Sequence, residues 1–327
     1  MKIGAPRESD SNENRVALVP ETVERLVKAG HEIFIEAGAG TAAGFPDLAY
    51  TDAGAKTSTA NDIAGSVDIF VHVQPPTIEE VGALKNGSIV VSTMNARSNS
   101  SLVSALASSG STALAMELVP RIARAQRMDV LSSQASIAGY KAALLAANSL
   151  GKYLPMMMTA AGTIPPAKIL VLGAGVAGLQ AIATARRLGA VVEAFDVRAA
   201  AGEQVESLGA KFIQPPAAED AEGAGGYARE QTEDEQEKQR EFLKEHIAQS
   251  DAVITTAAIP GRPAPLLMTE DMVDVMKPGS VVIDLAAESG GNVAGTVAGE
   301  IIDKNGISIN GPINVPSSMP FHASQLY

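Results

Sequence analysis

The sequence predicts an α/β protein of two Rossmann-like domains, with mainly parallel sheets and a cleft between the domains. Its length of 327 residues is enough for two separate cores. Short apolar runs alternate with helical segments along the chain, which is typical of parallel sheets covered by helices. A glycine-rich turn at 173–178 joins one such run to a helix. We place the first domain at residues 1–132 plus 314–327 and the second at 133–313.

The composition excludes several kinds of site and partner. A formal net charge of -12 argues against a nucleic-acid partner and favours solubility. Cysteine is absent, which excludes disulfides, thiolate metal sites and a cysteine nucleophile, and we expect no metal site. The N-terminus lacks the apolar core of a secretory signal. The longest apolar stretch, Ile169–Ala185, contains glycines of the turn motif and predicts a strand plus a helix rather than a membrane span.

The first domain shows strands and helices in alternation, without a glycine-rich phosphate loop. A helix at Pro20–Ala29 has apolar residues on one face, proline at its start and Gly30 after its end. The other elements predicted here are strands at Lys2–Gly4, Glu32–Glu36, Val67–Val73, Ser88–Ser92 and Ala113–Glu117, and a helix at Ser101–Ser108. Such alternation predicts a mainly parallel sheet.

A long helix at Ala135–Ser149 is expected to connect the domains, and Leu154–Pro166 follows it as a loop. The methionines at 156–158 of this loop can form a soft ligand surface, but methionine commonly fills irregular gaps, so we expect them in the core. Pro215–Gly226 is polar, glycine-rich and long, and it predicts a mobile loop.

The remaining elements of the second domain repeat the α/β pattern. We predict strands at Lys168–Leu172, Val191–Asp196, Lys211–Gln214, Asp251–Thr256, Val281–Leu285 and Ile307–Asn310, and helices at Leu179–Leu188, Gln204–Leu208 and Thr232–Ala248. No returning helix is visible after the last strand. Either the protein is compact and complete or the sequence is a piece of a longer chain, and we favour the piece.

The motif Gly173-Ala-Gly175-Val-Ala-Gly178 is expected to bind a dinucleotide. Its glycines permit a tight turn, close approach of the backbone to the pyrophosphate and close packing of helix on strand. Free N–H groups at the helix start, around Val176, then face the phosphates. Asp196 ends the next strand and is expected to bind the adenosine ribose, which favours NAD(H) over NADP(H). Arg198 complicates this preference, since an arginine there can hold a 2'-phosphate. The alternative is a glycine turn that binds nothing.

Candidate groups for proton transfer are few. An enzyme that oxidises an alcohol or amino acid with a nicotinamide needs an acid or base near its substrate. Of the four histidines, only His72 falls on a predicted strand of the first domain. We expect it to be a hydrogen-bonded residue of the sheet rather than a catalytic one.

Several segments resemble known proteins. Arg15–Pro20 and His31–Gly40 resemble the alanine dehydrogenase and transhydrogenase superfamily. More narrowly, five segments are similar to the NAD(H)-binding component, the alpha subunit, of proton-translocating NAD(P) transhydrogenase: Met156–Pro166, Gly173–Ala185, Asp196–Arg198, Gly225–Ala228 and Ile254–Gly261. The resemblance covers nearly the whole chain.

The sequence departs from alanine dehydrogenases where those enzymes bind their substrate. Gln74 stands in place of their substrate lysine, and Ser92–Ala96 lacks the histidine that they use. Arg15 remains, but alone it is not expected to bind a keto acid. The resemblance therefore implies direct hydride transfer between NADH and NADP⁺ bound to a partner domain. That reaction needs no general base, only two nicotinamide rings about 3–3.5 Å apart in a site without water.

The resemblance also implies which residues form the site. Arg121 would hold the carboxamide or phosphate side of the nicotinamide, Asp129 and Ser132 would fix the carboxamide, and Gln126 would reach toward NADP(H). Tyr227 would sit at the tip of a mobile loop that closes over the nucleotide, and Ala258 lies near the adenine side. The full cofactor-binding set is Arg121, Arg124, Gln126, Asp129, Ser132, Gly173, Gly175, Val176, Gly178, Asp196, Val197, Arg198, Gly226, Tyr227 and Ala258.

The expected assembly likewise follows from the resemblance. It implies a homodimer that docks an NADP(H)-binding domain and, through partner subunits, a membrane domain with the proton channel. The chain would then be cytoplasmic and peripheral on the inner face of the membrane, with AB-type (Si-Re) stereospecificity and activity only with its partner. Two alternatives remain: an amino-acid dehydrogenase near alanine dehydrogenase, and a non-catalytic NAD-binding module.

Overall fold

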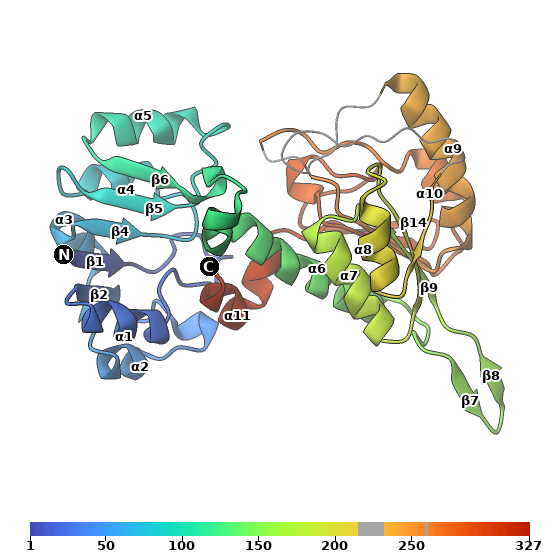
Figure 1. Ribbon diagram of the computed structural model, residues 1–327, viewed down its shortest axis with the longest axis horizontal. Coiled ribbons are helices and arrows are strands. Elements are labelled where there is room, and N and C mark those ends of the chain that lie inside the picture. Colours follow the sequence, from blue (N-terminus) through green and yellow to red (C-terminus); the bar gives the residue numbers. More distant parts are fainter. Residues whose placement is uncertain (215–231, 259–260) are drawn as a thin grey trace. The chain divides into compact units, whose positions relative to one another are not determined.

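The computed structural model describes residues 1–214, 232–258 and 261–327 (Figure 1). It divides into two compact units, one formed by Met1–Gln134 with Pro316–Tyr327 and the other by Ala135–Val315. None of the described helices is both long enough and apolar enough to cross a membrane. Gly226 and Tyr227, expected in the mobile loop, lie outside the described residues.

The first unit is built on a six-stranded sheet in the order β3-β2-β1-β4-β5-β6, and all its pairs are parallel. Its strands are β1 (Lys2–Ala5), β2 (Glu32–Glu36), β3 (Lys56–Ser58), β4 (Ile69–Val71), β5 (Ile89–Ser92) and β6 (Thr112–Ala115). Its α-helices are α1 (Pro20–Lys28), α2 (Asp47–Asp52), α3 (Ala60–Ser66), α4 (Ile78–Ala83), α5 (Ser100–Ser108) and α11 (Pro320–Gln325). The 3₁₀ turns are η1 (Thr41–Ala43), η2 (Met116–Leu118) and η3 (Ala123–Met128), while η6 (Val315–Ser318) leads into α11.

Alternation along the strands divides the apolar residues of this unit between two cores. Ile33 and Ile35 belong to one buried cluster, and Phe70 and Val90 belong to the other. Successive side chains of a strand point to opposite faces, so each face of the sheet has its own core. The cores fix the strand register and therefore the positions of the loops at the strand ends.

The second unit is built on a seven-stranded sheet in the order β11-β10-β9-β12-β13-β15-β14, in which only the β14–β15 pair is antiparallel. Its strands are β9 (Lys168–Leu172), β10 (Val191–Phe195), β11 (Lys211–Phe212), β12 (Ala252–Thr255), β13 (Val281–Asp284), β14 (Ile301–Lys304) and β15 (Ile307–Asn310). Its helices are α7 (Val176–Arg187), α8 (Ala201–Ser207), α9 (Glu233–Gln249), α10 (Glu270–Asp274) and the turn η5 (Ala287–Ser289), and α6 (Val130–Ser149) begins in the first unit. The predicted α/β class with mainly parallel sheets is confirmed.

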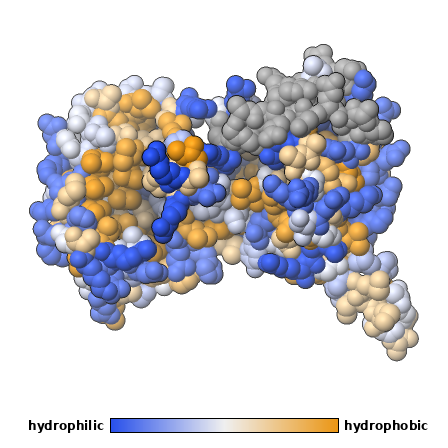
Figure 2. Space-filling view, viewed as in Figure 1, coloured by the Kyte–Doolittle hydropathy of each residue, from blue (hydrophilic) through white to orange (hydrophobic). Residues whose placement is uncertain are grey.

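The prediction of a loop at Leu154–Pro166 is wrong, because this segment forms a hairpin of β7 (Met157–Thr159) and β8 (Gly162–Ile164). The expectation of core methionines is also wrong, since Met156 is 58% and Met158 78% exposed. All three residues of β8 are exposed as well. The hairpin, at the lower right of Figure 2, shows apolar residues in tan beside paler, weakly hydrophilic ones.

No returning helix is predicted after Asn310, yet α11 (Pro320–Gln325) lies in the first unit. Pro320 starts it, Ala323 and Ser324 are buried, and the ring of Phe321 stacks on Phe45 with centroids 4.8 Å apart. A six-residue helix is too short to show a helical repeat of apolar residues in the sequence.

Candidate functional site

The glycine motif forms a turn between β9 and α7 that needs glycine at two positions for different reasons. Gly173 has φ +102°, a left-handed conformation, and an added Cβ would lie 2.6 Å from Oγ1 of Thr256. At Gly178 an added Cβ would lie 1.8 Å from the carbonyl oxygen of Gly173. Glycine at 178 therefore lets α7 pack directly against the turn that precedes it.

Gly175 differs, because no atom lies within 4 Å of where its Cβ would be. It is the N-cap of α7 and offers no side chain to the free N–H groups of the first turn. Val176, the first helical residue, is exposed. An open space beside unsatisfied helix N–H groups is suited to a phosphate, and the helix dipole adds to the attraction.

Asp196 follows β10 directly and is almost fully buried beside this turn. Its Oδ2 accepts a hydrogen bond from the backbone N–H of Ala174 at 2.7 Å. Arg198 pairs with it through Nε to Oδ1 and Nη2 to Oδ2, each at 2.9 Å, and donates its backbone N–H as well. Val197 between them is partly buried and packs on the neighbouring core. Asp196 thus ties the glycine turn to the end of β10, and Arg198 is held by the carboxylate.

The segment 121–132 carries most of the residues expected around the nicotinamide. It contains η3 and the first turn of α6, which begins at Val130, five residues before the predicted start. The cause is Asp129, whose Oδ1 accepts the backbone N–H of Ser132 at 2.9 Å as an N-cap. Its Oδ2 accepts the Ser132 hydroxyl at 2.6 Å and lies 3.6 Å from Nε of Arg121.

Asp129, Ser132 and Arg121 form a cluster with an anionic acceptor and a cationic donor. Arg121 also donates from Nη2 to the Ser132 hydroxyl at 3.3 Å. Burial raises the pKa of Asp129, but the hydrogen bonds from Ser132 and the charge of Arg121 outweigh it and lower the pKa overall. The carboxyl group is therefore ionised at neutral pH, and it can hold a ligand but has no proton to donate.

Gln126 and Arg124 lie on η3 and are exposed. Within the described part of the chain, neither side chain has a hydrogen-bond or ion-pair partner. Ala125 between them is buried and anchors the turn. These two side chains are free to contact a ligand or another molecule. Ala258 is also exposed, at the edge of the described residues after β12.

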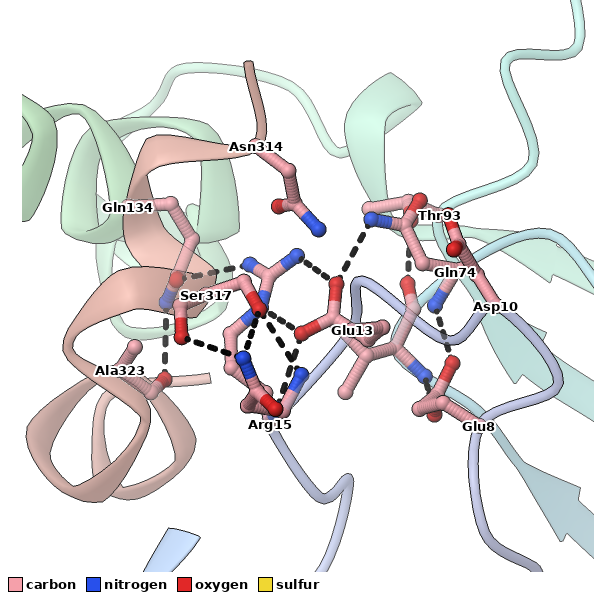
Figure 3. Close-up of polar contacts among 12 residues, drawn as sticks. Glu8, Asp10, Glu13, Arg15, Gln74, Thr93, Gln134, Asn314, Ser317 and Ala323 are labelled. Carbon is pink, nitrogen blue, oxygen red and sulfur yellow. Dashed lines mark hydrogen bonds and ion pairs between the residues drawn. The ribbon is translucent and has the colours of Figure 1, made fainter. Parts of the chain in front are cut away.

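A second polar cluster lies at the carboxyl end of the first unit's sheet, around Arg15 (Figure 3). Its guanidinium pairs with both oxygens of Glu13, Nε to Oε1 at 2.8 Å and Nη2 to Oε2 at 2.6 Å. Gln74 donates to Oε2 of Glu13 at 2.8 Å. The sequence motifs indicate Arg15 and Gln74 but not Glu13, which lies in the polar run before Arg15 and has no distinguishing signal there.

His72 lies one residue beyond β4 and is fully buried. Nδ1 lies 3.0 Å from a carboxylate oxygen of Glu8, and Nε2 lies 3.4 Å from a carboxylate oxygen of Glu80. Burial lowers the pKa of His72, but the carboxylates of Glu8 and Glu80 outweigh it and raise the pKa to about 10. His72 is a fixed cation in the interior rather than a proton-transfer group.

We expect His72 to keep both ring protons from pH 7 to pH 9. The folded pKa lies above the value of about 6.5 in an unfolded chain, so its contribution to stability is complete below pH 6.5 and is lost as the pH rises through 10. ¹⁵N NMR of the ring nitrogens measures the protonation directly. A neutral ring at pH 8 would contradict the assignment.

The family of the chain is shown by comparison with known proteins. Residues 4–138 match the family model "Alanine dehydrogenase/PNT, N-terminal domain", and residues 142–327 match "Alanine dehydrogenase/PNT, C-terminal domain". The chain belongs to the alanine dehydrogenase/PNT family, and the predicted family resemblance is confirmed.

Within this family the chain is more similar to transhydrogenases than to alanine dehydrogenases. It is 51% identical to an NAD(P) transhydrogenase subunit alpha protein of Rhodospirillum rubrum, over all of this chain and 87% of that protein. The crystal structure of transhydrogenase from Sinorhizobium meliloti matches with a TM-score of 0.91 and 50% identity, over all of this chain and 91% of that one. Alanine dehydrogenase of Mycobacterium tuberculosis is 30% identical, over 90% of this chain and 75% of that protein.

Proposed function

We propose that the chain is the NAD(H)-binding component of a proton-translocating transhydrogenase and takes part in direct hydride transfer between NADH and NADP⁺ held by a partner domain. In this reaction the C4–H bond of NADH breaks, the hydrogen leaves with both electrons, and a new C4–H bond forms on NADP⁺. No proton is taken from or given to a substrate, so the residues need only hold one ring against another.

The observation that carries the proposal is the environment of Arg15 and Gln74. A carboxylate substrate needs an unbalanced positive charge, and the charge of Arg15 is balanced by Glu13 at hydrogen-bond distance. Gln74 adds a neutral amide that itself donates to Glu13. His72 is surrounded by two carboxylates. The cluster therefore favours neither keto-acid binding nor proton transfer, which supports a transhydrogenase over an amino-acid dehydrogenase.

The cluster of Arg121, Asp129 and Ser132 suits a nicotinamide carboxamide. An amide has one acceptor oxygen and an NH₂ donor, and the cluster offers a guanidinium donor beside an ionised acceptor. Gln126, exposed and without a partner in the described part of the chain, would contact the NADP(H) side. We propose that these contacts fix which face of the ring is presented, and that the transfer is of the AB (Si-Re) type.

Mixing experiments separate the alternatives. Stopped-flow absorbance with NADH, an NADP⁺ analogue and an NADP(H)-binding domain from a related transhydrogenase should show rapid transfer that requires both proteins. Robust NADH formation from L-alanine and NAD⁺ would instead support an amino-acid dehydrogenase. NADH binding without transfer to the partner's nucleotide would support a non-catalytic module.

We expect Asp196→Ala to weaken NADH binding by about 1–3 kcal/mol, the cost of leaving polar groups unpaired. The change removes the proposed ribose acceptor and also frees Arg198, so discrimination against NADPH should decrease. Isothermal titration with NADH and NADPH measures both effects. Asp196→Asn is the control that keeps an acceptor for the Ala174 N–H, and unchanged affinities in both variants would disprove the ribose assignment.

We expect Gln126→Asn to slow hydride transfer by about tenfold while NADH binding changes by less than about twofold, because shortening the side chain by one methylene withdraws it from the partner's nucleotide. Stopped-flow rates and fluorescence titration give the two quantities. Arg127→Gln, a change at an exposed neighbour on η3, is the control. Equal losses of rate and affinity would argue against a role toward NADP(H).

The assembly proposed here has further components. We propose a homodimer that docks the NADP(H)-binding domain, with a membrane proton-channel domain in the complete complex, and a cytoplasmic place on the inner face of the membrane through these partners. The apolar β7–β8 hairpin supports self-association because an exposed surface of this kind commonly marks an interface. Sedimentation that finds only monomers at micromolar concentration would contradict the dimer.

A further inference from the structure

The half-buried side chain of Gln134 joins the start of α6 to the body of the first unit. Its Oε1 accepts a hydrogen bond from Nη1 of Arg15 at 2.9 Å. Its Nε2 donates to the carbonyl oxygen of Ala323 in α11 at 3.1 Å and to the hydroxyl of Ser133 at 3.3 Å. The amide is thus held at both ends (Figure 3), which fixes its rotamer and the helix that carries it.

Arg15 is itself a rigid support for this amide. Its side chain is 7% exposed, and that of Glu13 is fully buried. The two-point pairing with Glu13 leaves the guanidinium little freedom, because a planar fork on a carboxylate fixes direction as well as distance. Glu13 is held in turn by Gln74, whose backbone N–H donates to Glu8 at 3.0 Å. A continuous set of hydrogen bonds therefore runs from the end of β4 to α6.

Gln134 and Ser132 lie on opposite sides of the start of α6. Residues two apart on a helix point to nearly opposite sides, so Gln134 faces the support while Ser132 faces away from it. Asp129, the N-cap of the same turn, pairs with Ser132 on that far side. Val130, buried at the start of α6, adds only a non-directional apolar contact.

We propose that Arg15 is a positioning residue for the nicotinamide cluster: through Gln134 it fixes the first turn of α6 and so the placement of Ser132 and Asp129. The proposal rests on the proposed function for the identity of the ligand. In this chain Arg15 does not bind a substrate. Instead, Arg15 fixes the start of α6, whose Asp129 and Ser132 are proposed to hold the nicotinamide.

Gln134→Leu tests the link in the full chain, because leucine has a similar volume and no polar atoms. Amide hydrogen exchange at 130–134, followed by mass spectrometry, should become about tenfold faster, while exchange in the second half of α6 stays unchanged. The dissociation constant for NADH should rise about tenfold, and the hydride-transfer rate with the partner domain should fall by a similar factor. Asn148→Leu, an amide-to-leucine change at an exposed position of the same helix, should alter none of these values.

Gln134→Glu separates Arg15 from Ala323, since it keeps an oxygen for the guanidinium and loses the donor to the carbonyl. It should retain exchange and transfer within about twofold of the unchanged protein. The proposal is overturned if Gln134→Leu leaves exchange at 130–134 unchanged, or if Gln134→Glu is as impaired as Gln134→Leu. If exchange responds as expected but the unchanged protein transfers no hydride, the proposed function fails while the support of α6 by Arg15 stands.

Discussion

Gly178→Ala should lower NADH affinity about 100-fold and reduce the free energy of unfolding by about 1–3 kcal/mol. The new Cβ would lie 1.8 Å from the carbonyl oxygen of Gly173. Because that oxygen belongs to the backbone, no side-chain rotation relieves the clash, and α7 must move away from the turn. Movement of the helix start displaces the N–H groups proposed to bind the pyrophosphate. Calorimetric titration with NADH and urea denaturation measure the two quantities.

Gly175→Ala is the matched control, because its Cβ would meet no atom within 4 Å. This change should leave the free energy of unfolding unaltered and still weaken NADH binding, since the methyl group fills the space reserved for the pyrophosphate. If both variants lose stability equally, the open space at 175 is misassigned. If neither loses affinity, the dinucleotide does not bind at this turn.

Asp129→Ala should slow hydride transfer with the partner domain by about 10²–10³-fold, the range for removing one preorganised polar group from a reacting site. It should also cost about 1 kcal/mol of stability, because the N-cap of α6 is lost. Arg121 and Ser132 lose their common acceptor, so the carboxamide would no longer be fixed. Stopped-flow absorbance gives the rate, and thermal or urea denaturation gives the stability.

Asp129→Asn divides the two roles of this residue. Asparagine caps a helix as well as aspartate does, so stability should stay close to that of the unchanged protein, but the charge that pairs with Arg121 is removed. Transfer should therefore fall in Asp129→Asn although the helix start persists. A variant that keeps the full rate would show that the carboxylate serves only as the cap of α6.

The parallel sheets and the dinucleotide turn can be predicted from the sequence because both depend on local patterns. Buried strands such as β9 and β12 are short continuous apolar runs, and the spacing of Gly173, Gly175 and Gly178 between a strand and a helix indicates a tight turn with close helix packing. The start of α6 is harder to predict, because Asp129 and Ser132, which determine it, also fit a ligand-binding role. The same residue types, aspartate and serine, serve as helix caps and as ligand-binding residues. Here the carboxylate of Asp129 is proposed to do both.

The remaining differences arise from contacts between residues far apart in the chain. Nothing near Met158 in the sequence distinguishes an exposed hairpin from a core segment. Its exposure depends on whether distant parts of the chain pack against it. The pairing of Arg15 with Gln134 joins residues that lie 119 positions apart. The ring of His72 lies between Glu8 and Glu80, which come from two other segments. Such pairs are determined by the sheet and its cores, and a single sequence does not reveal them.

The most direct test of direct hydride transfer follows the hydrogen itself. NADH deuterated at C4 on the A face is incubated in ordinary water with NADP⁺, this chain and an NADP(H)-binding domain, and the NADPH formed is examined by NMR and mass spectrometry. We predict that the deuterium appears at C4 of NADPH on the B face without loss to water. Unlabelled NADPH, or deuterium released to the solvent, would contradict direct transfer between the two nicotinamide rings.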